Sequence, residues 1–346
     1  MGASRWPGFR PRWPGPSENG PTLAAAPGRA SSGGHDAGMP FRMDVSILIP
    51  VHNRVALTRA CLDTLFATLP DGLRAEVFVY DDCSTDPTPA YLATQRDRVT
   101  VLRGRERGSF ARNNNAMARQ ASGRHIVLLN NDTVLTPRWL EPMLELADEP
   151  SVGVVANWHT VPGSTTVNHA GVVFDAQHRD RRLYEGLDLE SLAGARRPRE
   201  MQGVIFACCV IPSELFRSMG GLDEAYRTGY EDLEFCFRAR QRGRAVVCTG
   251  ASVIGHHGGS SPGRFDTDTA NRRLFHERWS AYIEPDMLRY ASEDAVAWPT
   301  ESVAYKLCRR VWRNPMAQVV MGPMLKTEFG VKARQGVQRR LTRGEL

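Results

Sequence analysis

The sequence predicts an α/β fold in which helices flank a doubly wound sheet. Between about residues 45 and 150, short apolar segments alternate with stretches whose apolar residues recur every three or four positions. Such alternation is typical of βαβ units, which build a mostly parallel sheet. Polar residues gather directly after the apolar segments, at the edge where open α/β sheets bind their ligands. The sequence therefore predicts a ligand crevice along this edge.

The strands of this half are expected where nearly every residue is apolar, as in the centre of a parallel sheet. They are 45–50, 75–80, 99–102 and 125–129. The intervening helices are expected over 56–69, 87–96, 110–121 and 137–147. The last of these has Pro137 at a first helical position, after Thr136 as its N-cap.

The pattern changes after about residue 150. Strands are expected over 152–156, 204–211, 245–248 and 252–254, with a helix over 231–242. Residues 157–200 contain Gly, His and many Arg, and look like an inserted hairpin or loop region. Residues 1–40 are rich in Pro, Gly, Ala, Ser and Arg and are expected to be disordered. Residues 281–346 are expected to form a basic, partly helical C-terminal extension.

The composition fits a globular protein with anionic partners. Of its 346 residues, 42% are hydrophobic and 24% are charged, and the net charge of +6 suits nucleotide phosphates, acidic membranes or nucleic acid. The seven cysteines are scattered without a CxxC pair, which favours a reduced, cytoplasmic compartment. No apolar run approaches the roughly 18 to 20 residues needed to span a bilayer. We therefore expect a soluble or at most peripheral protein.

The basic tail after residue 306 has few aromatic residues. We expect it to contact a membrane surface rather than nucleic acid.

Four polar clusters follow strands and are expected to line one crevice. They are 50–53 (PVHN), 81–86 (DDCSTD), 108–113 (GSFARN) and 130–132 (NND). Carboxylates at such an edge accept hydrogen bonds from a base or from ribose hydroxyls, an arginine pairs with phosphate, and His52 is placed to stack on a base. A segment such as DDCSTD is also a good turn and N-cap sequence, and that alternative stays open.

A divalent metal is indicated by Asp132 and by His256. Asp132 ends an apolar run beside two amides, which suits a weakly held Mg²⁺ or Mn²⁺ that shares its shell with phosphate. His256 and His257 lie just past a strand, and an imidazole together with Asp132 makes a two-sided metal site. The alternatives are an Asn-Asp turn and a solvated Gly-Ser loop.

Glu231 and Asp232 fall at the start of a predicted helix. Negative charge is favoured there by the helix dipole, which is the simpler explanation of the pair. The functional interpretation is a general base held on a loop flanked by glycine.

The ordered set of motifs resembles the inverting glycosyltransferases of family two, which have the GT-A fold. The match runs from about Val45 to Trp279 through VSILIPVHNR, VYDDCSTD, ARNNNA, LLNND, GGLDEAY, GYEDLEFCFRAR and HHGGSS. VNHAGVVFDAQHRDRRLYEG and NRRLFHERW are similar to bacterial members that act on cell-surface or O-glycan sugars.

The resemblance implies a role for each matching residue. The nucleotide is expected to be held by Pro50, His52, Asn53, Asp82, Arg112 and Asn131. The metal is expected on Asp132 and His256, with His257 as the rival ligand. Asp232 matches the catalytic base and Glu231 its partner.

Two departures from the family pattern stand out. Asn130 and Asn131 precede the single acid of the metal motif, where the family usually has at least two acids. Phe206-Ala207 replaces a frequent Gly-Ala, which bears on the local acceptor pocket.

The resemblance implies a GT-A-like doubly wound mixed sheet over 41–280, with a nucleotide-binding half at 41–150 and an acceptor half at 151–280. It implies metal-dependent, inverting transfer of a hexosyl or deoxyhexosyl group from a nucleotide-sugar donor. The acceptor is expected to be a hydroxyl of a bacterial glycan, glycolipid or glycoprotein, or of a lipid-linked acceptor that the basic tail approaches at the inner membrane, with no nucleic-acid partner. The alternative is a non-catalytic relative that binds a sugar nucleotide or glycan. A dinucleotide dehydrogenase is disfavoured because no GxGxxG follows the first strand.

Overall fold

The computed structural model describes residues 42–258 and 268–296. Their contacts divide the chain into two units, Met1–Asp286 and Met287–Leu346. The second unit contributes helix α8 (Met287–Glu293) to the described residues. The predicted disorder of 1–40 and the basic tail beyond 296 lie outside the described residues.

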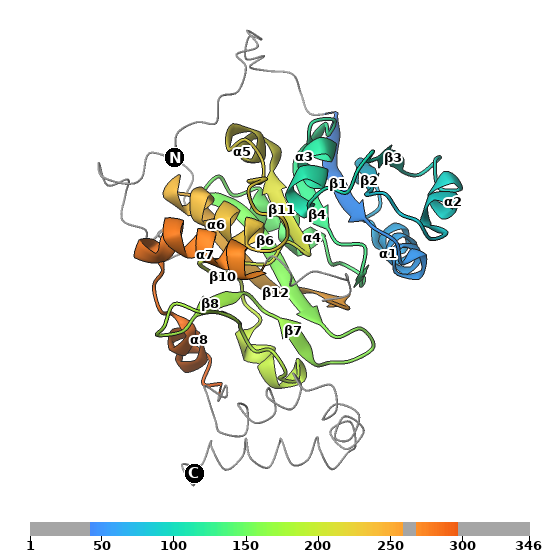
Figure 1. Cartoon of the computed structure of the whole chain (residues 1–346). Coiled ribbons are helices and arrows are strands. Elements are labelled where there is room, and N and C mark those ends of the chain that lie inside the picture. Colours follow the sequence, from blue (N-terminus) through green and yellow to red (C-terminus); the bar gives the residue numbers. More distant parts are fainter. Residues whose placement is uncertain (1–41, 259–267, 297–346) are drawn as a thin grey trace, which may run out of the picture. The chain divides into compact units, whose positions relative to one another are not determined.

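The first unit is built on a mixed ten-stranded sheet (Figure 1). Its first strands are β1 (Met43–Val51), β2 (Ala75–Asp81), β3 (Thr100–Arg103), β4 (Gly123–Leu129) and β5 (Thr133–Val134). The later ones are β6 (Val152–Thr160), β7 (Val167–His169), β10 (Arg199–Glu200), β11 (Cys208–Pro212) and β12 (Ala245–His256). The order is β10-β12-β6-β11-β4-β1-β2-β3, with β5 beside β12 and β7 beside β6.

Parallel and antiparallel pairs share this sheet. β4, β1, β2 and β3 run parallel, as do β12 and β6, whereas β11 lies antiparallel between β4 and β6. The predicted α/β class with a doubly wound mixed sheet is confirmed.

Alternate strand residues point to opposite faces of the sheet, so both faces carry apolar side chains, and helices cover them. The helices of the first half are α1 (Val55–Thr68), α2 (Thr88–Ala93), α3 (Phe110–Ala118) and α4 (Glu141–Ala147). Ile47 and Ile49 of β1 share one buried core with residues of α1, α2 and α4. Each fully buried side chain of this kind stabilises the fold by about 1.5–3 kcal/mol.

A second core joins the inserted region to later helices. A hairpin of β8 (Val172–Phe174) and β9 (Asp180–Arg182) precedes the short helices η1 (Glu190–Ala195) and α5 (Ser213–Ser218). Phe174 of this hairpin packs with Phe237 of α6 (Glu231–Gln241) and Phe275 of α7 (Asp268–Trp279). The helix η2 (Ser280–Tyr282) follows α7. The predicted inserted hairpin therefore packs on the helix that carries Asp232.

The helix predicted from Pro137 begins later, at Glu141. The prediction was wrong because Arg138 takes a left-handed conformation, with φ of 61°, which no α-helix continues. Thr136 does not cap the helix, since its hydroxyl donates to the carbonyl of Val253 at 2.6 Å.

Other boundaries also differ from the predictions: the strand expected over 204–211 is β11, which begins at Cys208. The two strands expected over 245–254 are one strand, β12, whose pairing with β6 shifts register between Thr249 and Val253. β6 extends to Thr160, so part of the region expected to be irregular belongs to the sheet. Long-range pairing extends both strands through residues with no apolar pattern.

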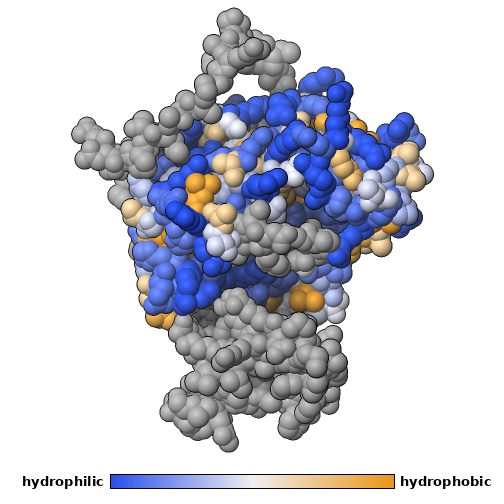
Figure 2. Space-filling view, viewed as in Figure 1, coloured by the Kyte–Doolittle hydropathy of each residue, from blue (hydrophilic) through white to orange (hydrophobic). Residues whose placement is uncertain are grey.

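The visible surface of the described residues is mainly hydrophilic, with scattered apolar side chains (Figure 2). No helix among the described residues has the length and apolar character to cross a membrane. The cysteines described are free thiols, at positions 61, 83, 208, 209, 236 and 248.

Candidate functional site

The carboxyl ends of β1, β2 and β4 lie at one edge of the sheet. β1 pairs in parallel with both neighbours, which places Val51 beside Asp81 and Leu48 beside Leu128. The segments that follow these strands therefore leave the sheet at the same edge. Pro50 lies within β1, opposite Tyr80.

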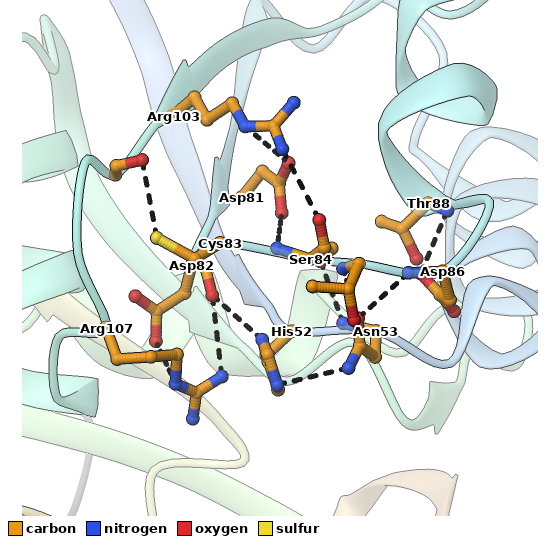
Figure 3. A network of polar contacts seen from close by, with 12 residues as sticks. His52, Asn53, Asp81, Asp82, Cys83, Ser84, Asp86, Thr88, Arg103 and Arg107 are labelled. Atoms are coloured by element: carbon orange, nitrogen blue, oxygen red, sulfur yellow. Dashed lines mark hydrogen bonds and ion pairs between the residues drawn. The ribbon is translucent and has the colours of Figure 1, made fainter.

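His52 is held against the backbone of the Asp82 segment (Figure 3). Its Nδ1 lies 2.8 Å from the carbonyl oxygen of Asp82, and because a carbonyl only accepts, Nδ1 carries the proton. Its Nε2 then accepts from Nδ2 of Asn53 at 3.2 Å. Both ring nitrogens are used inside the protein, so His52 has its ring face to offer a ligand.

The Asp82 carboxylate is buried and oriented by its neighbours. Oδ1 accepts from the backbone N–H of Gly108 at 2.7 Å. Oδ2 lies 3.6 Å from Nε of Arg107, a half-exposed side chain. Asp82 is therefore fixed through one oxygen and retains acceptor capacity at the other.

Arg107 is a site residue that the sequence analysis missed. Its Nη1 also donates to the Asp82 carbonyl at 3.4 Å. The surrounding segment, 103–107, carries three arginines, and nothing in their spacing distinguishes this one. Arg112, which the sequence singled out, pairs with Glu106 at 2.9 Å instead.

Asn53 organises the loop after β2. Its Oδ1 accepts from the backbone N–H groups of Thr85 at 2.7 Å and Asp86 at 3.3 Å, and its own N–H donates to Ser84 Oγ. It takes a left-handed conformation, with φ of 57°. Asn53 thus supports the base-binding candidates by fixing the loop beside them.

Asp132 and His256 come together as the sequence pairs them. His256 Nε2 lies 3.2 Å from Asp132 Oδ1, and both side chains are at least nine-tenths buried. Strand pairing of His256 with Thr133 and a bond from the His257 N–H to the Asp132 carbonyl, at 3.0 Å, hold this arrangement. The His257 side chain is exposed, so the geometry favours His256 as the ligand.

The donor set fits a divalent cation. Among the described residues, neither buried ring nitrogen of His256 makes a hydrogen bond, and the approach of Nε2 to Asp132 is a close contact of the two side chains only. The buried carboxylate supplies the oxygen ligand that Mn²⁺ and Mg²⁺ prefer alongside phosphate oxygens, and the buried imidazole beside it adds a nitrogen ligand. Within 42–258 and 268–296, no group of three or more His, Cys, Asp or Glu side chains is placed to hold a metal.

Asn131 faces α1 rather than Asp132. Its Nδ2 donates to Thr58 Oγ1 at 2.9 Å, and Thr133 Oγ1 donates to the carbonyl of Asn130 at 2.8 Å. These bonds fix the turn that carries Asp132.

Two further buried histidines lie beside His256. The ring of His159 is 5.2 Å from that of His256 and 5.2 Å from that of His169. Burial lowers the pKa of both His159 and His169 well below the usual value, so both are neutral. The sequence analysis missed them because they lie in the stretch that was expected to be irregular.

Glu231 and Asp232 occupy the first turn of α6. Glu231 is buried and Asp232 is half-buried. Their helix, α6, packs against β6 and β12, and β12 carries His256 at its end.

The sequence model of glycosyl transferase family 2 matches residues 46–220. An O-antigen biosynthesis protein, RfbC of Myxococcus xanthus, is 34% identical over 224 residues, which is 63% of this chain and 17% of that protein. Polypeptide N-acetylgalactosaminyltransferase 4 of Caenorhabditis elegans is 28% identical over 226 residues, which is 61% of this chain and 38% of that protein. The chain thus spans well under half of the length of these relatives.

Solved structures share the fold. GalNAc-T7, crystallised with UDP, GalNAc and Mn²⁺, superposes with a TM-score of 0.53 at 16% identity, covering 77% of this chain and 57% of that one. The mannosyltransferase PcManGT of Pyrobaculum calidifontis, in complex with GDP-Man and Mn²⁺, gives 0.50 at 17% identity, covering 87% and 81%.

Proposed function

This chain belongs to glycosyl transferase family 2 and has the GT-A fold, and from that premise we propose that it transfers a sugar from a nucleotide-diphosphate donor to a hydroxyl group, with inversion. The observation that carries the proposal is the buried Asp132–His256 pair, at 3.2 Å. It lies at the sheet edge where the His52–Asp82 cluster also emerges.

The donor's base is assigned to the His52–Asp82 cluster. The second oxygen of Asp82 accepts an N–H of the base, and the face of His52 supports the ring. Asn131 and Arg112 remain candidates for the ribose and the phosphates. The donor-binding half is proposed as 41–150 and the acceptor half as 151–280.

The metal is assigned to Asp132 and His256. When bound, Mn²⁺ or Mg²⁺ neutralises the charge that develops on the diphosphate leaving group. The similarity to proteins whose structures contain Mn²⁺ supports this assignment.

Asp232 is assigned as the general base, with Glu231 as its partner. Asp232 takes the proton of the acceptor hydroxyl while that oxygen attacks the anomeric carbon. The bond from this carbon to the diphosphate breaks on the opposite side, so the configuration inverts in one displacement.

The acceptor is proposed to be a bacterial glycan, glycolipid or glycoprotein assembled at the cytoplasmic side of the membrane. The similarity to an O-antigen biosynthesis protein supports a role in polysaccharide synthesis. The membrane contact is assigned to the basic tail, which lies outside the described residues.

The proposal is tested with a panel of UDP-, GDP- and dTDP-sugars, scoring the nucleoside diphosphate released by hydrolysis with Mn²⁺, with Mg²⁺ and with EDTA. Metal-dependent release from one donor class supports it. A chain that binds a nucleotide sugar without releasing the diphosphate is a non-catalytic relative.

A further inference from the structure

The loop before Glu231 is bent sharply just where it enters α6. Gly229 and Tyr230 both take left-handed conformations, with φ of 92° and 73°. Tyr230 is the N-cap residue of α6, yet its side chain makes no capping bond. Tyrosine disfavours this conformation, so contacts from elsewhere must hold it.

The first such contact comes from Asn271 of α7. Its Nδ2 donates to the carbonyl of Thr228 at 2.8 Å and to that of Gly229 at 2.9 Å. The Asn271 side chain is buried. Because one amide group binds two consecutive carbonyls, it fixes the direction of the backbone between them.

The second contact is made by the hydroxyl of Tyr230. It donates to Oδ1 of Asp180 on β9 at 2.7 Å and accepts from Nε of Arg272 on α7 at 2.9 Å. Burial, reinforced by Asp180, raises the pKa of Tyr230, so the hydroxyl keeps its proton. The Tyr230 ring also packs against Phe275 of α7, with the centroids 5.4 Å apart.

These bonds connect three separate segments at the start of α6. α7 lies beside α6 in the core that also contains the β8–β9 hairpin (Figure 1). The carbonyl of Tyr230 accepts from the Glu234 N–H at 2.9 Å, so the position of Tyr230 sets the first turn of the helix. Asp232 lies in that turn.

We propose that Tyr230 and Asn271 are positioning residues that aim the Asp232 carboxylate at the acceptor hydroxyl. They do so by tying residues 228–230, the base loop, to β9 and α7. The inference rests on the assignment of Asp232 as the base. The β8–β9 hairpin, which belongs to the acceptor half, then also supports the general base through Asp180.

The first test is Tyr230→Phe, which removes one hydroxyl and keeps the ring that packs on Phe275. The readout is hydrolysis of the donor found by the UDP-, GDP- and dTDP-sugar panel. In hydrolysis a water molecule replaces the acceptor hydroxyl and gives its proton to the same general base. We expect kcat to fall about tenfold, while KM for the donor stays within twofold. An unchanged kcat overturns the inference.

Tyr226→Phe is the matched control. Tyr226 is a buried tyrosine of the same core, and losing its hydroxyl breaks no bond to the base loop among those described. We expect wild-type kcat and KM. A fall equal to that of Tyr230→Phe would mean that the loss reflects the core as a whole, and would overturn the inference.

A comparison of Tyr230→Phe with Asp232→Asn separates this inference from the proposed function. If Asp232→Asn is inactive while Tyr230→Phe is fully active, the base assignment stands and the positioning role falls. If Asp232→Asn hydrolyses the donor at the wild-type rate, the base assignment falls and the inference falls with it.

Hydrogen exchange gives a readout that does not depend on activity. In Asn271→Ala the backbone amides of 228–234 should exchange about tenfold faster, with unchanged protection in β1 and β4. Unchanged exchange over 228–234 overturns the role of Asn271.

Discussion

His256 Nε2 lies 3.2 Å from Asp132 Oδ1, and a backbone pairing between β5 and β12 brings the two side chains together. The His257 N–H also bonds to the Asp132 carbonyl, so the turn after β4 and the end of β12 are joined by backbone contacts at neighbouring positions. The spacing of the two candidate ligands is therefore set by the sheet rather than by either loop alone.

His256→Ala should lower the apparent affinity for the metal more than the apparent affinity for the nucleotide-sugar donor. Removing one of two protein ligands leaves Asp132 to hold the cation with the donor's phosphates, and we expect the half-saturating Mn²⁺ concentration to rise at least tenfold. Mn²⁺ titration of donor hydrolysis measures this.

His257→Ala is the comparison for that titration. The His257 side chain is exposed, and its backbone N–H, which makes the contact with Asp132, is kept. A larger rise for His257→Ala than for His256→Ala would reverse the ligand assignment.

Asp232→Asn should abolish turnover and spare nucleotide binding. The amide has nearly the same shape but takes no proton, and loss of a general base costs about 10²- to 10⁴-fold in rate. Steady-state kinetics gives kcat, and calorimetry with UDP or GDP gives the nucleotide affinity. Normal turnover would rule out Asp232 as the base.

Asp82→Asn should weaken nucleotide binding while leaving the loop in place. The amide oxygen still accepts from Gly108, but an NH₂ group replaces the second carboxylate oxygen and meets the base N–H as a donor. A hydrogen bond to a charged group contributes about 1.5–3 kcal/mol, so we expect the Kd for the nucleotide to rise about tenfold to a hundredfold.

Calorimetry measures that Kd, and the melting temperature shows whether the fold is kept. An unchanged Kd for both UDP and GDP would mean that the nucleotide base binds away from Asp82.

The local pattern of the sequence was enough to predict the α/β fold and the strand ends that carry Asp82 and Asp132. Mainly apolar runs of four to six residues predict buried parallel strands directly. The pairing of Asp132 with His256 was predicted from their chemistry and their motifs, since nothing local in the sequence joins β5 to β12.

The features that were missed depend on contacts between distant segments. Arg107 and Arg112 look equivalent in the sequence, and only the fold turns one of them toward Asp82. His159 and His169 become neighbours through the pairing of β6 with β7. The start of α4 was misplaced because Thr136 bonds to Val253, across the fold, instead of capping the helix.

Gly123→Ala should destabilise the fold. A Cβ at this position would lie 2.5 Å from the backbone of both Val45 and Ser46, which cannot move without disturbing β1. Overpacking of this kind costs about 1–3 kcal/mol, so the melting temperature should fall by several degrees. Gly194→Ala is the control, since nothing lies within 4 Å of its added Cβ. Equal melting temperatures for the two variants would contradict the packing of β4 against β1.

The buried His125 should make the fold less stable as the pH falls. Burial lowers the pKa of His125 below its usual 6.5, although Asp148, 3.5 Å from its Nε2, partly opposes this. Below pH 6.5 the unfolded chain therefore binds a proton that the folded chain does not, and stability declines until the folded pKa is passed. His125→Gln removes this titration, so its free energy of unfolding should change less between pH 6.5 and 5 than that of the wild type. Urea unfolding at each pH measures the difference. Parallel pH profiles would show that His125 gains its proton as readily in the folded chain as in the unfolded one.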